Sequence, residues 1–144
     1  MATVREILLR KGSEIVAVLP AATVLEAAHL MNQRGIGGVA VMVEGELAGI
    51  FTERDVLRRV VVPGRDPSET RISEVMTTPV VTCTPGTRIE ECAALMTGRR
   101  IRHLPVVEDG RPVGIVTIGD LLAFQVMDQQ ATIEYMNSLV YDIR

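Results

Sequence analysis

Residues 45–57 read GELAGIFTERDVL, and residues 110–122 read GRPVGIVTIGDLL. The two stretches lie 65 positions apart, and the same offset aligns residues 20–58 with residues 85–123 without a gap. Identical pairs in this register include Pro20 with Pro85, Gly49 with Gly114, Thr52 with Thr117 and Asp55 with Asp120. A register this long indicates an internal duplication, which decides how the rest of the chain is interpreted.

Each copy begins with the same strand and helix. Short β-branched runs predict the first strands, at 15–19 and 80–83. Apolar residues at helical spacing predict the helix that follows in each copy. Two Thr-x-x-Glu sequences fit capping boxes at the starts of these helices, Thr23 with Glu26 and Thr87 with Glu90.

Two further strands and a second helix complete each copy. The predicted strand pairs are 39–43 with 47–51 and 104–107 with 113–116. The turns at 44–46 and 108–111 each contain a glycine, which tolerates the positive φ of a tight hairpin. The second helices begin at Glu53 and at Ile118. A three-stranded sheet cannot cover its own apolar face, so we expect an α/β (α+β) fold of tandem β-α-β-β-α repeats, packed by their sheets with pseudo-two-fold symmetry.

The remaining segments divide the chain into units. Residues 63–70, PGRDPSET, predict a linker between a first repeat at 3–62 and a second at 71–128. A lead-in helix is expected before each copy, at 3–10 with a Thr3/Glu6 capping box and at 71–76. Residues 129–144 predict a C-terminal helical tail, with Ile133, Met136, Val140 and Ile143 on one face.

The second helices carry more apolar residues than a helix with one solvent face needs. The helix after Asp55 contains Val56, Leu57, Val60, Val61 and Val62, and the helix after Asp120 contains Leu121, Leu122, Ala123, Phe124, Val126 and Met127. We interpret the excess as the interface of a homodimer, with deeper burial inside one copy as the alternative.

Composition limits the classes of partner. The 144 residues are 47% apolar and 3% aromatic, with a net charge of −3, which predicts an aliphatic core and does not favour nucleic acid as a partner. The longest charge-free apolar stretch, 15–25, is broken by Pro20 and is far shorter than the ~20 residues of a membrane helix. Without a signal-peptide pattern, we expect a cytoplasmic protein with no membrane partner. Cys83 and Cys92 are expected to be free thiols in a reducing compartment.

Motifs of catalysis and metal binding are missing from the sequence. It contains no GxSxG, GxxxxGK or HExxH, and the stretch Gly35–Gly38 lacks the GxGxxG spacing of a dinucleotide loop. His29 and His103 have no partner near in sequence and form no metal-ligand spacing with the cysteines. We therefore expect no catalytic residues, no catalytic cofactor and no metal.

Thr52-Glu-Arg-Asp55 and Thr117-Ile-Gly-Asp120 are the candidate sites. Each follows an apolar strand and opens a helix, so each also fits a simple helix cap. A helix N-terminus favours phosphate, and a threonine hydroxyl adds a hydrogen-bond donor. An aspartate one turn later can accept both hydroxyls of a ribose, a spacing that suits a nucleotide. From the residues alone, the cap and the nucleotide site are equally supported.

The repeats resemble the two halves of a cystathionine-β-synthase (CBS) domain pair. The resemblance rests on TVLEAAHLMNQRGIGGVAVMVEGELAGIFTERDVLRRV at 23–60, TRIEECAALMTGRRIRHLPVVEDGRPVGIVTIGDLLA at 87–123 and the lead-in ISEVMTTPVVTCTP at 72–85. It implies a module with two clefts, commonly paired as a disc-like dimer, that binds AMP, ADP, ATP, NAD(H) or S-adenosylmethionine. It also implies regulation of a partner protein rather than catalysis, since the barrel of a CBS-containing dehydrogenase needs ~250 residues. A structural or interaction module without ligand remains the alternative.

The resemblance also assigns roles to individual residues. It implies that Asp55 and Asp120 hold ribose hydroxyls and that Thr52 and Thr117 contact phosphate. It implies that the base near Asp55 is bordered by Ile50, Val80, Val81 and Thr82, and the base near Asp120 by Ile115, Ile15, Val16 and Ala17. The basic residues differ between the copies, since Arg102 and His103 correspond to Gly37 and Gly38. We expect Lys11, Arg102 and His103 to serve the phosphates of one cleft and Arg54 those of the other.

Overall fold

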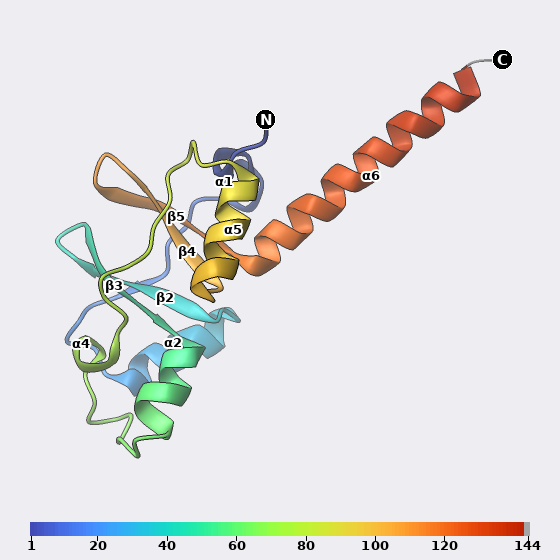
Figure 1. Cartoon of the computed structure of the whole chain (residues 1–144). Helices are drawn as coiled ribbons and strands as arrows, with labels where there is room; N and C mark the ends of the chain where they lie inside the picture. The colour runs from blue at the N-terminus through green and yellow to red at the C-terminus, as the bar shows by residue number, and fades with distance from the viewer. Residues whose placement is uncertain (143–144) are drawn as a thin grey trace.

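The computed structural model describes residues 1–142. The first half contains α1 (Val4–Lys11), β1 (Ala17–Val18), α2 (Val24–Arg34), β2 (Gly38–Val43), β3 (Glu46–Thr52), the short α3 (Glu53–Asp55) and the π-helical η1 (Val56–Val61). The second half contains α4 (Ile72–Val75), α5 (Ile89–Arg99), β4 (His103–Glu108), β5 (Arg111–Thr117) and α6 (Ile118–Asp142). The predicted repeat of β-α-β-β-α is therefore confirmed except at the first strand of the second copy (Figure 1).

The two sheets differ in size. One has the order β1-β2-β3, with β1 parallel to β2, and the other contains only β4 and β5. The strand predicted at 80–83 is wrong, because only its last residue, Cys83, forms a bridge to a strand. Thr77 pairs with Ile50 of β3, and a single parallel bridge joins Cys83 to Val106 of β4. The strand predicted at 15–19 is shortened to Ala17–Val18.

The hairpin turns follow the prediction. Glu44 and Gly45 have φ angles of 51° and 80°, and Asp109 and Gly110 have φ angles of 54° and 76°. Two successive residues with positive φ define the turn that matches the twist of paired strands. The glycine occupies the second position in both turns.

Two of the predicted capping boxes are wrong. Thr23 accepts a hydrogen bond from the Glu26 N–H at 3.1 Å, so this cap is confirmed on the threonine side. Helix α5 begins one residue later than expected, and the Thr87 hydroxyl instead accepts the N–H of Thr84 at 3.0 Å. The side chain of Thr3 makes no capping bond at the start of α1.

The lead-in helices are exchanged between the two halves. Val4 and Ile7 of α1 lie in the core formed by α5, β4 and β5, whereas Ile72 and Val75 of α4 lie in the core formed by α2, β2 and β3. Close approach depends on a matched pair of glycines. A Cβ on Gly49 would lie 2.6 Å from Sδ of Met76, and a Cβ on Gly114 would lie 2.6 Å from Cδ2 of Leu8. The halves are therefore interlocked, although their sequences are consecutive.

Helix α6 is a single helix. It joins the second helix of the second copy to the predicted C-terminal tail and runs from Ile118 to Asp142. Its C-terminal part projects away from the globular body (Figure 1). Ile133, Met136 and Val140 of the predicted apolar face are exposed, and Ile143 lies outside the described residues. No helix in the described part of the chain is both long and apolar enough to cross a bilayer.

Candidate functional site

Asp55 is a buried carboxylate at the last residue of the short α3, with only 7% of its surface exposed. Its Oδ2 accepts the N–H of Thr52 at 3.0 Å, as the helix-start motif predicts. Its Oδ1 accepts the hydroxyl of Thr77 at 3.0 Å and lies 3.6 Å from Nε of Arg59. The carboxylate is thus both a cap and an anionic acceptor fixed at the wall of a cleft.

A cleft of about 470 Å³ opens beside this carboxylate. One wall comes from Ile50, Thr52 and the helical turns after them, and the other comes from the end of α5 and the start of β4. The volume lies within the range of roughly 300–1,000 Å³ typical of small-molecule sites. The cleft therefore lies between the two halves, with both contributing side chains.

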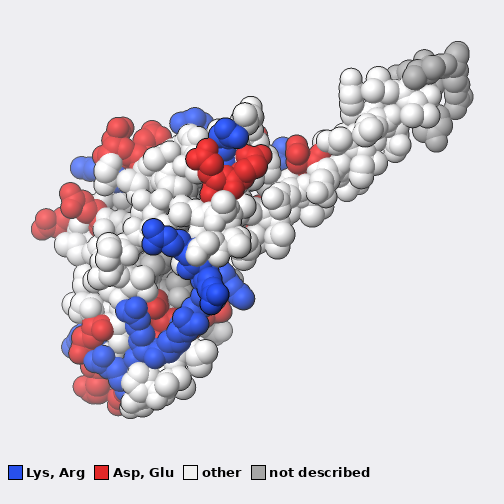
Figure 2. Space-filling model, viewed as in Figure 1, with Lys and Arg blue, Asp and Glu red and all other residues white. Residues whose placement is uncertain are grey.

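Arginines dominate the lining of this cleft. Six line it, namely Arg54, Arg58, Arg59, Arg99, Arg100 and Arg102, against two acids, Glu53 and Asp55. Arg54 is also tied to the opposite wall by a hydrogen bond to the carbonyl oxygen of Arg100. Figure 2 shows basic side chains in a band that runs from the end of α5 over the helical segment after β3. Such a concentration of guanidinium groups suits a multiply charged anion such as a phosphate chain.

His103 lies at the junction of the two halves. A Cβ on Gly37 would come within 3.3 Å of its Cε1, and a Cβ on Gly38 within 3.1 Å of its Cδ2. Burial lowers the pKa of His103, and the nearby Lys11 and Arg102 lower it further, whereas Glu53 and Asp120 raise it. The imidazole therefore tends to be neutral in the ligand-free protein.

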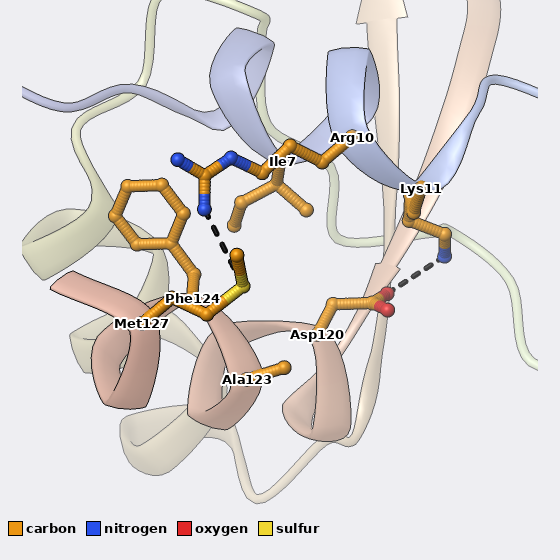
Figure 3. A pocket seen from close by; sticks show the side chains of 7 residues that line it. All are labelled: Ile7, Arg10, Lys11, Asp120, Ala123, Phe124 and Met127. Atoms are coloured by element: carbon orange, nitrogen blue, oxygen red, sulfur yellow. Dashed lines mark hydrogen bonds and ion pairs between the residues drawn. The ribbon is translucent and has the colours of Figure 1, made fainter. Parts of the chain in front are cut away.

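The pocket beside Asp120 is smaller, and its carboxylate is already paired with a lysine. It has a volume of about 160 Å³ and is lined by Ile7, Arg10, Lys11, Asp120, Ala123, Phe124 and Met127 (Figure 3). Nζ of Lys11 lies 2.7 Å from Oδ2 of Asp120 and donates to the carbonyl oxygen of Ile115 at 2.7 Å. The N–H of Thr117 donates to the same Oδ2 at 2.8 Å. An ammonium group thus covers the carboxylate of the second motif.

The structure brings together only part of the predicted set. Ile50, Thr52, Arg54, Asp55, Arg102 and His103 all line the larger cleft. Lys11, expected with Arg102 and His103, lines the smaller pocket and contacts Asp120, although its charge still acts on the pKa of His103. Arg54, expected to serve the other cleft, lies with Arg102 instead.

Apart from Ile50, the residues expected around the bases do not line either pocket. Among the described residues that line these two pockets, none is Ile15, Val16, Ala17, Val80, Val81, Thr82, Ile115 or Thr117. Val16 and Val81 pack against the two cores instead. The carbonyl oxygen of Ile115 accepts a hydrogen bond from Lys11, and the hydroxyl of Thr117 accepts one from the N–H of Asp120.

Several lining residues were not predicted. Thr77 precedes the segment expected at the cleft, and its antiparallel pairing with Ile50 carries it to Asp55. Arg58 and Arg59 follow Asp55 by one helical turn, a spacing visible in the sequence. Arg99 and Arg100 end a helix of the other half, so only the packing of the two halves shows where they lie.

Comparison with known proteins identifies the family. The CBS domain family model matches residues 4–62 and 72–126. The chain is 37% identical over 123 residues to the mitochondrial CBS domain-containing protein CBSX3 of Arabidopsis thaliana, covering 82% of this chain and 60% of that protein. It is 39% identical over 119 residues to the CBS domain-containing protein YhcV of Bacillus subtilis, covering 83% and 84%.

A solved structure of similar length shows the same fold. A protein with CBS domains from Burkholderia ambifaria aligns with a TM-score of 0.86 and 41% identity, over 89% of this chain and 96% of that one. The inosine-5'-monophosphate dehydrogenase of Methanocaldococcus jannaschii is 33% identical over 120 residues, but these cover only 23% of that enzyme. The chain belongs to the CBS domain family and consists of a pair of CBS domains, a class whose members are typically regulatory.

Proposed function

We propose that this chain is a regulatory sensor that binds an adenine nucleotide in the cleft beside Asp55 and passes the signal to a partner protein as a homodimer. The observation that carries the proposal is the combination of one buried carboxylate with six arginines across a single cleft. A carboxylate accepts from the two hydroxyls of a ribose, and arginines bind phosphate oxygens. In a nucleotide the phosphates are attached to the ribose, so one ligand can reach the carboxylate and the arginines together.

The polarity of the cleft supports a particular orientation of the ligand. The ribose would replace the hydroxyl of Thr77 at Oδ1 of Asp55, since that hydroxyl can rotate to another acceptor. Ile50 would supply apolar contact to the base, and the arginines of α5 and η1 would hold the phosphates. The number of arginines favours a ligand with two or more phosphates, such as ADP, ATP or NAD(H), over AMP.

The second motif is expected to bind weakly or not at all. Lys11 already neutralises Asp120, and the adjoining pocket has about a third of the volume of the larger cleft. A ligand would have to displace an ion pair before its sugar could reach the carboxylate. One nucleotide per chain is therefore the stoichiometry that the proposal predicts.

A homodimer is proposed from the apolar side chains that the globular body leaves exposed. Leu57, Val61 and Val62 of the segment after β3 are exposed, and so are Leu122 and Val126 of α6. The two groups occupy corresponding positions in the two repeats, as the predicted interface requires. An apolar face of this kind is stabilised by association with a partner surface.

Titration calorimetry with AMP, ADP, ATP, NAD(H) and S-adenosylmethionine tests the proposal. We expect one site per chain, and we expect Asp55→Asn to weaken binding at least tenfold, because the amide keeps an acceptor for the Thr52 N–H but loses the charge. Asp128→Asn, on an exposed turn of α6, is the charge-matched control and should bind as the parent does. Absence of heat with every ligand would leave the alternative, an interaction module in which Asp55 is only a cap.

A further inference from the structure

The exposed side of α6 has the spacing of a coiled-coil seam. Leu122, Val126, Gln129, Ile133, Met136 and Val140 alternate at intervals of four and three residues, which places them at successive d and a positions of a heptad repeat. The five apolar side chains are 57%, 59%, 58%, 59% and 68% exposed. A projecting helix with an apolar stripe of this kind is marginal in water unless the stripe packs against another helix.

The charge pattern of α6 identifies the partner. The positions that flank the seam are uncharged, namely Ala123, Gln125, Gln130, Thr132, Asn137 and Leu139. Asp128 and Glu134 lie at outer positions, so two identical helices can pair without placing like charges against each other. A heterologous helix selected by charge would need charged flanks, and an anionic membrane would repel a helix that contains no Lys or Arg.

We propose that α6 pairs in parallel with α6 of a second copy, through a two-stranded coiled coil that begins at Leu122 and includes Val140. The parallel orientation rests on the homodimer of the proposed function, because Leu122 and Val126 belong both to the exposed patch of the body and to the seam. In a parallel pair, equivalent residues share a layer, so Gln129 faces Gln129 of the second copy. A single polar core position of this kind fixes the register of the two helices.

Disulfide cross-linking tests this pairing on the full chain. Met136→Cys places a thiol in the seam, and Tyr135→Cys places one on the outer face of the same turn. Under mild oxidation with diamide, we expect Met136→Cys to form the covalent dimer at least tenfold faster than Tyr135→Cys, because a parallel core layer brings the Cβ atoms within disulfide distance. The parent protein controls for Cys83 and Cys92, which are buried.

A second variant separates the coiled coil from the rest of the protein. Adding Ile133→Asp to Met136→Cys should slow cross-linking at least tenfold while the nucleotide dissociation constant stays that of the parent. Equal rates for Met136→Cys and Tyr135→Cys, no cross-linking of Met136→Cys, or cross-linking unaffected by Ile133→Asp would each overturn the proposal. Failure of nucleotide binding with seam-specific cross-linking would overturn the proposed function alone.

Discussion

The ring of His103 lies directly against the backbone of Gly38, so that a Cβ at Gly38 would come within 3.1 Å of Cδ2 and 3.2 Å of Cγ of the histidine. These two residues occupy equivalent positions in the two repeats. The small residue of one half therefore accommodates the large residue of the other, and the sequence asymmetry between the copies is a structural complementarity at the border of the larger cleft.

Replacing Gly38 by alanine should move His103. The ring must shift by a few tenths of an ångström, because Thr52 crowds the same Cβ at 3.2 Å. We expect a loss of about 1–2 kcal/mol in the free energy of unfolding, the cost typical of overpacking, and weaker nucleotide binding. Gly98→Ala is the control, since its Cβ meets nothing within 4 Å, and alanine in α5 should stabilise by about 0.5 kcal/mol. Urea denaturation of both variants measures the difference, and an unchanged Gly38→Ala would contradict the close contact.

Replacing Lys11 by methionine should uncover the second site. Methionine keeps much of the apolar stem but removes the ammonium group that contacts Asp120 at 2.7 Å. Both side chains are partly exposed, so we expect a stability loss of no more than about 1 kcal/mol. The stoichiometry of nucleotide binding should rise from one to two per chain in calorimetry.

The matched control for this variant is Arg5→Met. Arg5 lies on the same helix and forms a longer and more exposed pair with Glu108 at 3.9 Å. Its replacement should leave the stoichiometry at one. If Lys11→Met also bound a single nucleotide, Lys11 would not be what closes the second site.

Nucleotide affinity should depend on pH through His103. Burial lowers the pKa of its imidazole, so the free protein holds it neutral near pH 7. A bound phosphate would stabilise the imidazolium and raise that pKa, and binding would then take up a proton. We expect affinity to increase as pH falls from 8 to 6, and His103→Gln to remove that part of the increase, whereas His29→Gln on the exposed side of α2 should retain it.

The same shift has the opposite effect on stability. Because the pKa of His103 is lower in the folded chain, the unfolded chain binds the proton more strongly, and the stabilisation present above about pH 6.5 is lost as pH falls through the folded pKa. The free energy of unfolding of the ligand-free parent should therefore decrease below pH 6.5 more steeply than that of His103→Gln. Parallel pH profiles for the two proteins would contradict the assignment.

The two thiols should be unreactive in the folded protein. Cys83 is 6% exposed and Cys92 is fully buried. A hydrogen bond between the two thiols raises the pKa of Cys83 and lowers the pKa of Cys92, so the burial of both side chains is what limits their reaction with a reagent. We expect labelling by a disulfide reagent at pH 8 to require unfolding, with two thiols released together in denaturant. Rapid labelling of either cysteine in buffer would contradict the burial of this pair.

The sequence predicted the local features of the fold better than the tertiary ones. The hairpins at Gly45 and Gly110 and the helix starts at Thr52 and Thr117 depend on neighbouring residues, and the structure confirms them. The strand at 80–83 was predicted from β-branched residues alone, yet only Cys83 of this segment forms a bridge, to Val106 of β4. Strand propensity alone does not decide whether a segment finds a strand to pair with.

The candidate site shows the same contrast between residues that a local motif predicts and residues that only tertiary packing brings in. Asp55 and Thr52 follow from one short motif, but the arginines of α5 reach the cleft only because the halves pack together. The contact between Lys11 and Asp120 joins residues 109 positions apart in sequence. It arises from the exchange of the lead-in helices, which no local pattern predicts.

The exchange of α1 and α4 determines the order in which a nascent chain can fold. The core around α1 is incomplete until the ribosome has synthesised α5, β4 and β5, and the core around β2 is incomplete until Ile72 and Val75 have emerged. Neither half can then reach its final form as an independent unit during translation. A gene fragment encoding one repeat alone should yield an aggregation-prone product, whereas two fragments expressed together could complement each other by trading their leading segments.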